Sequence, residues 1–393
     1  MAAASTSASA GEILELVRSG RARTRREVQE LTGLSRSTLS LRMSQLIAAG
    51  YVRESGQAAA ATGRPARILS FDEARQLVLS VDIGATHANL ALLDAGSQII
   101  MQAHAEIDIA APPEVTLRAL SKRLTELLAR SGRSIASVVG VGVGIPAPVR
   151  FSTQRPNHPP LMRAWHDFPI AETLREHLGV PVFVDNDANL MAMGEARERY
   201  PDAPSLIFVK VGTGIGAGII LRGQPERGIA GGAGDIGHIR IMEADVGHRC
   251  TCGAVGCLAT EASGGAIVRM LREEGQDVRS AGDVNRLVNL GDPRAVELTQ
   301  RAGRLIGDVL ATSVALLNPS VVVIGGIMAD PGDVLVESVR DRIYERTIPL
   351  ATRELFVAAS SLGADAAIQG ARHMVIDQTF SAKAVDDRLR PAS

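Results

Sequence analysis

Cysteine is scarce in this chain of 393 residues, and aromatic side chains make up only 3% of it. The three cysteines all lie between Cys250 and Cys257. An odd, clustered set argues against a disulfide framework and favours metal ligation. With so few aromatic residues, the core must rest on Ala, Val, Leu and Ile. The 46% of hydrophobic residues excludes a disordered chain, and the length predicts two or three domains.

Long hydrophobic runs are also missing. No stretch approaches the ~20 apolar residues that a membrane-spanning helix needs. The first residues lack a basic segment followed by an apolar one, which argues against a secretory signal. We therefore expect a cytoplasmic protein without a membrane partner.

The formal net charge is only −1, but the charge is unevenly distributed. Residues 1–70 contain ten arginines and five glutamates, a net charge of +5, so the rest of the chain is mildly acidic. A small basic module ahead of a larger acidic one favours a phosphate-bearing partner at the front end. Chance scatter of arginine would produce the same asymmetry, so charge alone does not decide.

The first 75 residues have the pattern of three short helices followed by a β-hairpin. Apolar residues recur at helical spacing over 11–19, 24–31 and 35–48, and short strands are expected at 51–53 and 68–69. This order is typical of a winged helix-turn-helix domain.

Local signals support these helices. Thr24 and Glu27 have the spacing of a capping box, and Ser35 is expected to cap the third helix. Leu31 and Ile47 fall on the apolar stripes and are expected to face inward.

In a helix-turn-helix, the second helix of the motif enters the major groove and presents its outer face to base edges. An arginine in the wing can enter a minor groove. The predicted DNA-binding residues are Arg36, Ser37, Thr38, Ser40, Arg42 and Arg64. The alternative is a helical protein-interaction module with a solvated polar face, but the positive charge and the wing favour DNA.

From residue 76 the pattern changes to buried strands, glycine-rich turns and intervening helices. Helices are expected at 113–130, 191–199, 264–274 and 294–317. Strands that alternate with helices predict an α/β body over residues 76–380, with sites at the strand ends. Residues 381–393 are expected to be a tail.

Two glycine-containing turns follow buried strands. In Asp82-Ile-Gly84-Ala-Thr86, the carboxylate can hold a hydrated Mg²⁺, and glycine and threonine allow close approach to phosphate. Residues 211–218 (VGTGIGAG) are expected to form a second loop. That loop could cradle phosphates or form a glycine-rich turn under a packed helix.

Residues 185–189 (DNDAN) place two carboxylates and two amides at another strand end. Such groups can hydrogen-bond the hydroxyls of a sugar, and one aspartate could take a proton from an attacking hydroxyl. A helix cap rich in Asp and Asn uses the same residue types, so this pattern leaves both interpretations open.

The cysteines follow the pattern Cys250-x-Cys252-x4-Cys257 on a short, glycine-containing loop. Three thiolates with one imidazole favour a tetrahedral structural Zn²⁺, and His238 and His248 are both candidates for the imidazole. Buried free thiols or a redox pair are the alternatives.

Together these features resemble the ROK family (repressors, open reading frames and sugar kinases). The specific run is VKVGTGIGAGIILRGQPERGIAGGAGDIGHIRI, followed by CTCGAVGCL, and the likeness extends from about residue 10 to residue 375. The resemblance implies an actin-like (ribonuclease H-like), two-lobed ATPase-type fold with a sugar bound between the lobes. The winged helix is similar to the regulator branch, whose members bind operators as dimers or higher oligomers such as tetramers.

The resemblance also implies roles for individual residues. The nucleotide-phosphate loops would be Asp82, Gly84 and Thr86, and Gly212, Thr213, Gly214 and Gly216. The sugar ligands would be Asn157, Asn186, Asp187, Asp235 and His238, with Asp187 also the catalytic base. The metal ligands would be His238, Cys250, Cys252 and Cys257. Trp165 lies in the segment that usually helps to close over the sugar.

Several positions depart from the family pattern. Ala85 and Ala147 replace glycines, Asp235 replaces a glutamate, and Ala259 replaces a glutamate that binds sugar. A lost carboxylate removes a charge-assisted hydrogen bond worth roughly 1.5–3 kcal/mol. We therefore expect weaker hexose binding and absent or very slow phosphorylation, although both loops for ATP and Mg²⁺ are recognisable.

These observations predict a sugar-responsive transcriptional regulator, a repressor of carbohydrate-metabolism genes. Its expected partners are double-stranded operator DNA and a carbohydrate or sugar phosphate. The alternative is an ATP-dependent, hexose-type sugar kinase that carries a DNA-binding appendage.

Overall fold

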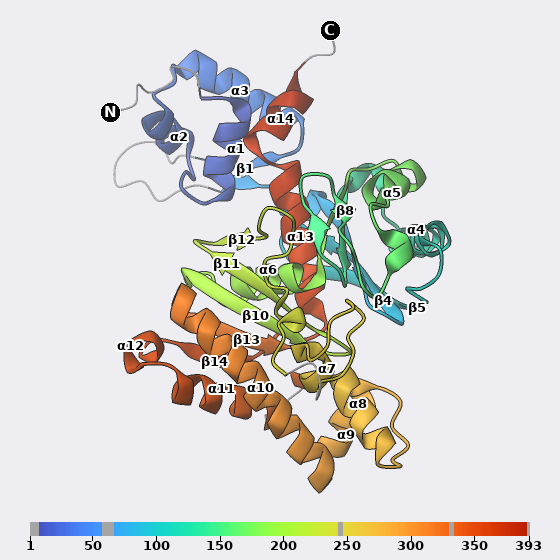
Figure 1. The fold of residues 1–393 in the computed structure, drawn as a ribbon. Coiled ribbons are helices and arrows are strands. Elements are labelled where there is room, and N and C mark those ends of the chain that lie inside the picture. The colour runs from blue at the N-terminus through green and yellow to red at the C-terminus, as the bar shows by residue number, and fades with distance from the viewer. Residues whose placement is uncertain (1–7, 57–66, 243–246, 330–333, 391–393) are drawn as a thin grey trace.

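The computed structural model describes residues 8–56, 67–242, 247–329 and 334–390. Two five-stranded sheets form the body, and a small module built from the N-terminal helices lies beyond one of them (Figure 1). None of the described helices combines the length and the apolar character that crossing a membrane requires.

The first sheet defines the N lobe. Its strands are β3 (Leu77–Ile83), β4 (His87–Asp94), β5 (Ile99–Glu106), β6 (Val138–Ile145) and β9 (Val182–Asn186), in the order β5-β4-β3-β6-β9. The first three strands are antiparallel neighbours, whereas β6 and β9 run parallel to β3.

The second sheet defines the C lobe and repeats this arrangement. Its strands are β10 (Ser205–Val211), β11 (Ile215–Leu221), β12 (Gln224–Glu226), β13 (Val321–Gly325) and β14 (Phe356–Ala359), in the order β12-β11-β10-β13-β14. Again an antiparallel meander is followed by two parallel strands. The two lobes are therefore topological equivalents, as the implied actin-like fold requires.

Helices cover both sheets. In the N lobe, α4 (Pro113–Arg130) packs against α5 (Ile170–Leu178), and a small hairpin joins β7 (Val149–Arg150) to β8 (Arg155–Pro156). The remaining C-lobe helices are α7 (Leu258–Ala262), α8 (Gly264–Glu273), α9 (Ala281–Asn289), α10 (Pro293–Leu317), α11 (Val334–Arg346) and α12 (Pro349–Thr352).

Two helices exchange between the lobes. Helix α6 (Asp187–Glu198) follows the last N-lobe strand but packs on β10 and β11, whereas α13 (Asp365–Thr379) follows the last C-lobe strand but packs on β3 and β6. Their backbones touch where they cross. A Cβ added at Gly194 would lie 2.1 Å from the carbonyl oxygen of Ala366, and one at Gly370 would lie 1.8 Å from that of Leu190. Glycine permits this crossing because any side chain would collide with backbone.

The N-terminal module contains α1 (Ala10–Arg18), α2 (Arg25–Thr32), α3 (Arg36–Ala48), β1 (Val52–Ser55) and β2 (Ile68–Phe71). These are the three helices and the hairpin that the sequence predicts. The capping box at α2 is only half formed. Thr24 accepts a hydrogen bond from the Glu27 backbone N–H at 3.2 Å, but the Glu27 carboxylate accepts from the Arg23 N–H at 2.6 Å rather than from that of Thr24.

The expected tail over 381–393 is wrong for its first residues, because they form helix α14 (Ala382–Leu389). Figure 1 shows α14 beside α1 at the end of α13. The Gly11 N–H donates to the Asp386 carboxylate at 2.9 Å. The buried Phe380 ring packs edge-on against the rings of Tyr51 and Phe71, with 5.3 and 4.9 Å between ring centres. The end of the chain therefore completes the core of the N-terminal module.

Two apolar residues of the N-terminal module do not face inward as expected. Leu31 is 51% exposed and Ile47 is 36% exposed. The core of the module forms instead on the side where α1, β1 and β2 meet Phe380 and Val385. A helical stripe cannot show which of its residues contact a segment more than 300 positions away.

Candidate ligand cleft and metal cluster

Three charged side chains from different elements meet where strands of both lobes end. Asp82 and Lys210 are the second-to-last residues of β3 and β10, and Asp187 begins α6. The Lys210 Nζ donates a hydrogen bond to Asp187 Oδ2, and the two form an ion pair. Asp82 is buried, and its Oδ1 has no hydrogen-bond partner among the described residues.

Burial and ion pairing compete in this group. Burial disfavours the charge of Lys210, but the Asp187 and Asp82 carboxylates outweigh it and raise the pKa of Lys210 above its usual value. Burial also raises the pKa of Asp82 to about 6, opposed by the Lys210 ammonium and reinforced by the Asp187 carboxylate. The cluster therefore holds an ammonium among two buried carboxyl groups.

The first predicted phosphate loop is a tight turn. The Gly84 N–H donates to the His87 carbonyl at 2.7 Å, which turns β3 back into β4. Thr86 is exposed at the tip, and Gly84 is half-buried. The structure therefore places the residues of this loop together, after Asp82.

The second predicted loop is shorter than expected. It covers only residues 212–214, where the Gly212 N–H donates to the Gly214 carbonyl at 2.9 Å and Thr213 is exposed. The placement of Gly216 in this loop is wrong, because Gly216 lies in β11 opposite Lys210. A Cβ at the neighbouring Gly218 would lie 2.2 Å from the Ala188 carbonyl oxygen. Gly218 therefore allows α6 to pack closely on β11.

Asn186 acts as the N-cap of α6. Its side-chain oxygen accepts from the N–H groups of Ala188 and Asn189 at 3.0 and 3.2 Å, and its Nδ2 donates to the Ala147 carbonyl at 3.1 Å. Helix α6 therefore begins at Asp187, four residues before the expected start. The capping interpretation holds for Asn186, and Asp187 remains at the helix start.

Asp185 is fully buried and anchors an arginine. Its Oδ2 accepts from the Arg227 Nε at 2.7 Å, and the guanidinium lies 3.9 Å from the centre of the Phe151 ring. Burial raises the pKa of Asp185, and the Arg227 charge opposes that shift. Asp185 is thus a structural partner of Arg227, which sequence reasoning missed.

Arg227 opens a segment, residues 227–238, that connects the predicted sugar ligands. Asn157 Nδ2 donates to the Ala230 carbonyl at 3.0 Å, which joins an N-lobe loop to this segment. Further along, the Ala217 N–H donates to the Gly234 carbonyl at 2.8 Å, which holds the segment against β11. Asp235 and His238 follow, with 3.9 Å between the Asp235 Oδ1 and the His238 Nε2.

Trp165 is not exposed toward this segment. Its ring is completely buried in the N-lobe core, and its Nε1 donates to the Ile109 carbonyl at 3.0 Å. This hydrogen bond holds the segment around Trp165 against Ile109, in the loop before α4.

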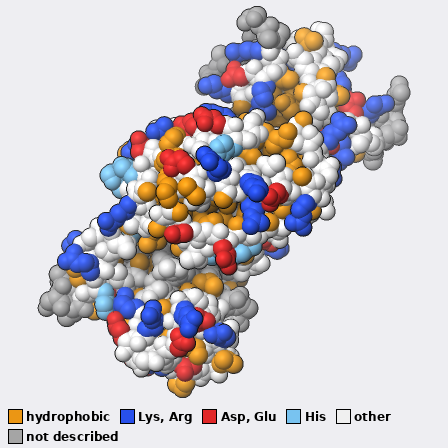
Figure 2. All heavy atoms as spheres, turned by 90° about the vertical axis from the view of Figure 1, so that its right-hand side faces the viewer, with side chains coloured by type: hydrophobic (Ala, Val, Ile, Leu, Met, Phe, Trp, Pro, Cys, Tyr) orange, Lys and Arg blue, Asp and Glu red, His pale blue; other side chains and the backbone are white. Residues whose placement is uncertain are grey.

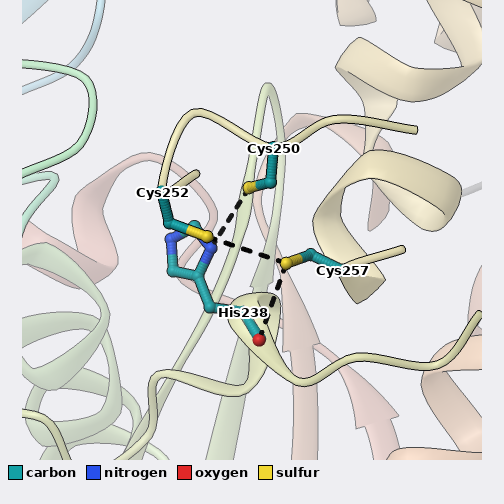
Figure 3. Close-up of side chains that lie close together, drawn as sticks. All are labelled: His238, Cys250, Cys252 and Cys257. Atoms are coloured by element: carbon teal, nitrogen blue, oxygen red, sulfur yellow. Dashed lines mark hydrogen bonds between the residues drawn. The ribbon is translucent and has the colours of Figure 1, made fainter. Parts of the chain in front are cut away.

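The predicted metal ligands converge. One ligand atom from each of His238, Cys250, Cys252 and Cys257 lies within 4.8 Å of the others. Figure 3 shows the three thiols gathered around the His238 ring, with 3.4 Å between Cys250 Sγ and His238 Nδ1. Burial and the neighbouring Cys252 and Cys250 raise the pKa of Cys257 to about 12, an effect that a bound cation would reverse. The donor set suits a soft, tetrahedral metal ion.

His248 belongs to a different contact. Its Nδ1 lies 2.8 Å from Glu261 Oε1, and its backbone N–H donates to the same oxygen at 3.0 Å. Glu261 is buried and holds the start of the cysteine loop. The fold therefore selects His238 rather than His248 for the metal cluster.

The predicted DNA-binding residues lie on α3, except for Arg64, which is outside the described residues. Arg36, Ser37 and Ser40 are exposed, whereas Thr38 and Arg42 are half-buried. The hydroxyls of Ser37 and Thr38 hydrogen-bond to the N-cap Ser35 at 2.9 and 2.8 Å, so capping uses part of their capacity.

The molecular surface does not concentrate one sign of charge on the face drawn in Figure 2. Basic and acidic side chains are interspersed there, and hydrophobic side chains gather in its central part. This matches the balanced total charge of the chain.

Comparisons with known proteins agree on one family. The model of the ROK family matches residues 78–378. The xylose repressor of Bacillus subtilis (strain 168) is 27% identical over 357 residues, which covers 90% of this chain and 91% of that protein.

Two solved structures share the fold. A ROK family transcriptional regulator, described as a homologue of the E. coli MLC protein, superposes with a TM-score of 0.80 at 25% identity and covers 97% of this chain and 98% of its own. A ROK family glucokinase from Streptomyces griseus, solved in complex with glucose and AMPPNP, has a TM-score of 0.65 at 26% identity and covers 76% of this chain and 98% of its own.

Proposed function

The chain belongs to the ROK family, and from this premise we propose that it is a sugar-responsive DNA-binding transcriptional regulator, a repressor of carbohydrate-metabolism genes. The observation that carries the proposal is the N-terminal module. The regulator structure matches 97% of the chain, whereas the glucokinase matches only 76%. The family model begins at residue 78, just after the module.

The proposed DNA-binding domain is a winged helix-turn-helix in residues 1–75, with the exposed face of α3 reading the major groove. Arg36 and Ser40 are exposed on this helix. The domain shares a core with Phe380 and α14, which extend from α13, and α13 packs on the N-lobe sheet. A change in lobe closure on sugar binding would reach the DNA-binding domain through this helix and change the spacing of two such domains in a homodimer or tetramer.

The proposed effector is a carbohydrate or sugar phosphate held by Asn157, Asn186, Asp187, Asp235 and His238. Support comes from the segment 227–238, which contacts the Asn157 side chain and the Asp185 strand end and leads to Asp235 and His238. The proposed metal is a structural Zn²⁺ on His238, Cys250, Cys252 and Cys257. Since His238 stands in both groups, the metal would fix one edge of the sugar site.

Operator selection tests this function. Genomic fragments are captured by the purified protein with and without xylose, glucose and N-acetylglucosamine, and affinities are then measured by fluorescence anisotropy. We expect sugar-dependent release of specific fragments and weaker binding at higher salt, because arginines displace condensed counterions. Arg36→Ala and Arg42→Ala should each weaken operator binding by about 1–3 kcal/mol.

The matched control is Arg118→Ala, on the exposed face of α4, which should keep the wild-type operator affinity. Unchanged affinity in both α3 variants, with folding intact, would show that α3 is not the recognition helix. The sugar kinase alternative rests on the likeness to the glucokinase. Incubation with ATP and the same sugars tests it directly, and turnover abolished by Asp187→Ala would support it.

A further inference from the structure

Lys210 lies at a position that corresponds to Asp82 in the other lobe. Asp82 is the sixth residue of the seven-residue strand β3, and Lys210 is the sixth of the seven-residue strand β10. Each strand is followed by a short turn, and each residue pairs with a glycine of the parallel neighbour, Gly144 for Asp82 and Gly325 for Lys210. Equivalent positions of the two sheets therefore carry a carboxyl group, on Asp82, and an ammonium group, on Lys210, and the two groups interact electrostatically.

The ammonium of Lys210 engages the carboxylate that the kinase interpretation needs as a free base. Asp187 is almost fully buried, and both of its oxygens already accept a hydrogen bond. Oδ1 accepts from the Ala188 N–H at 2.7 Å, and Oδ2 accepts from Lys210 Nζ. A general base must hydrogen-bond the hydroxyl from which it takes a proton, and at Oδ2 that hydroxyl would share the oxygen with an ammonium.

The same ammonium stands where a divalent cation would have to bind. A Mg²⁺ for phosphoryl transfer is held by carboxylate oxygens and bridges the phosphates of the nucleotide. Asp82, near the end of β3, and Asp187, at the start of α6, are both buried, and the Lys210 charge acts on both. A second cation there would meet direct repulsion from the half-buried Lys210 ammonium, which its ion pair with Asp187 holds in place. The residues present therefore do not fit Mg²⁺ between Asp82 and Asp187.

We propose that Lys210 is a built-in cation that replaces the divalent metal of a phosphoryl-transfer site and makes this cleft a binding site without kinase chemistry. The proposal deepens the regulator function, because a sensor must bind its effector without converting it. The proposal also implies that the effector binds to this cleft by itself, without a Mg²⁺–nucleotide complex beside it.

The experiment measures Mn²⁺, which replaces Mg²⁺ at oxygen sites, with the zinc-loaded full-length protein. Free Mn²⁺ is counted by electron paramagnetic resonance, with and without AMPPNP. The variants are Lys210→Met, which keeps the chain length without the charge, and Lys210→Arg, which keeps the charge. Lys122→Met on the exposed face of α4 is the matched control.

We expect no Mn²⁺ binding at this site in the wild type, Lys210→Arg and Lys122→Met. Lys210→Met should bind Mn²⁺ with an affinity at least tenfold above the detection limit at which the wild type shows no binding, and Asp82→Asn in the same chain should remove the gain. The wild type alone also tests the proposal if Lys210→Met does not fold. Mn²⁺ binding by the wild type that Asp82→Asn abolishes would overturn it, as would equal Mn²⁺ affinities of the wild type and Lys210→Met. This experiment does not measure operator binding. A negative result would therefore contradict the Lys210 proposal without contradicting the proposed regulator function.

Discussion

The two lobes have the same strand order but are completed by different chemistry. The N lobe is extended between its fourth and fifth strands, and this extension, residues 146–181, closes around the buried Trp165. The C lobe is extended between its third and fourth strands, where four metal-type ligands gather. The two lobes therefore share their strand order, but their extensions are stabilised differently. A buried aromatic residue packs in the N-lobe extension, and a group of metal-type ligands lies in the C-lobe extension.

The strand ends show the same contrast at the scale of single residues. At equivalent positions the N lobe presents Asp82 and the C lobe presents Lys210. The Lys210 ammonium interacts with the carboxylates of both Asp82 and Asp187. An aspartate at position 210 would instead add a third negative charge to this group. Equivalent backbone positions of the two lobes can therefore carry side chains of opposite charge.

The largest expected effect concerns the C-lobe extension. Cys257→Ser should reduce zinc from one ion per chain to none, because binding of a structural zinc contributes roughly 10–16 kcal/mol in zinc-finger peptides. Mass spectrometry of the metal content measures the loss. Hydrogen exchange should accelerate over the described part of the cysteine loop, residues 247–257, and stay unchanged over 146–181.

His248→Gln is the matched control for this loss, since His248 contacts Glu261 and lies outside the cluster. It should keep its zinc. Folded wild-type protein without zinc would contradict the assignment of the cluster.

The second prediction concerns the contact between the exchanged helices. The His373 side chain on α13 is 16% exposed, and its Nε2 lies 2.7 Å from Arg372 Nη2 and 2.8 Å from Glu198 Oε1 on α6. Nε2 can accept from Arg372 or donate to Glu198, and burial favours the neutral ring in either arrangement. Burial lowers the pKa of His373 to about 4, and the Glu198 hydrogen bond only partly offsets this effect.

The unfolded chain therefore binds a proton at His373 that the folded chain does not bind between pH 6.5 and about 4. Stability should fall as pH is lowered through this window, by up to roughly 3 kcal/mol for this residue. Urea unfolding at pH 4.5 and 7 measures the difference. His373→Gln should reduce it, whereas His177→Gln on the exposed face of α5 should not. An identical pH dependence in His373→Gln would show that the ring is charged in the folded state.

The third prediction concerns the crossing of α6 and α13. Gly370→Ala should lower the free energy of unfolding by about 1–3 kcal/mol, because the added methyl group meets the Leu190 backbone and the helices must separate. Gly232→Ala, where nothing lies within 4 Å of the new Cβ, is the control. Denaturant titration compares the two. Equal stability of Gly370→Ala and the wild type would mean that the helices are not in backbone contact.

The smallest effect is expected in the N-lobe extension. Trp165→Phe keeps an aromatic ring but removes the Nε1 donor to the Ile109 carbonyl, which should cost about 1 kcal/mol. Thermal unfolding measures the loss, and the zinc content should not change. A loss of zinc in this variant would show that the two extensions depend on one another.

Local sequence patterns were sufficient to predict the features that depend on neighbours along the chain. Helical and strand periodicity located α4 and the buried strands, because amphipathic spacing reflects which face of a local element is buried. The N-cap residues Thr24 and Ser35 were recognisable because a cap bonds to an N–H only three residues away. The three cysteines were recognisable as a ligand set because they lie within eight positions of one another.

Features that depend on contacts between distant segments became visible only in the folded chain. The tertiary structure selected His238 over His248, placed Gly216 and Gly218 in a strand under α6, and completed the N-terminal core with Phe380. It also brought Lys210 against Asp187, although Lys210 looks in the sequence like a polar residue in a buried strand. Ion pairs and packing act through space, and the residues they join are brought together by the fold of the whole chain, which local patterns do not encode.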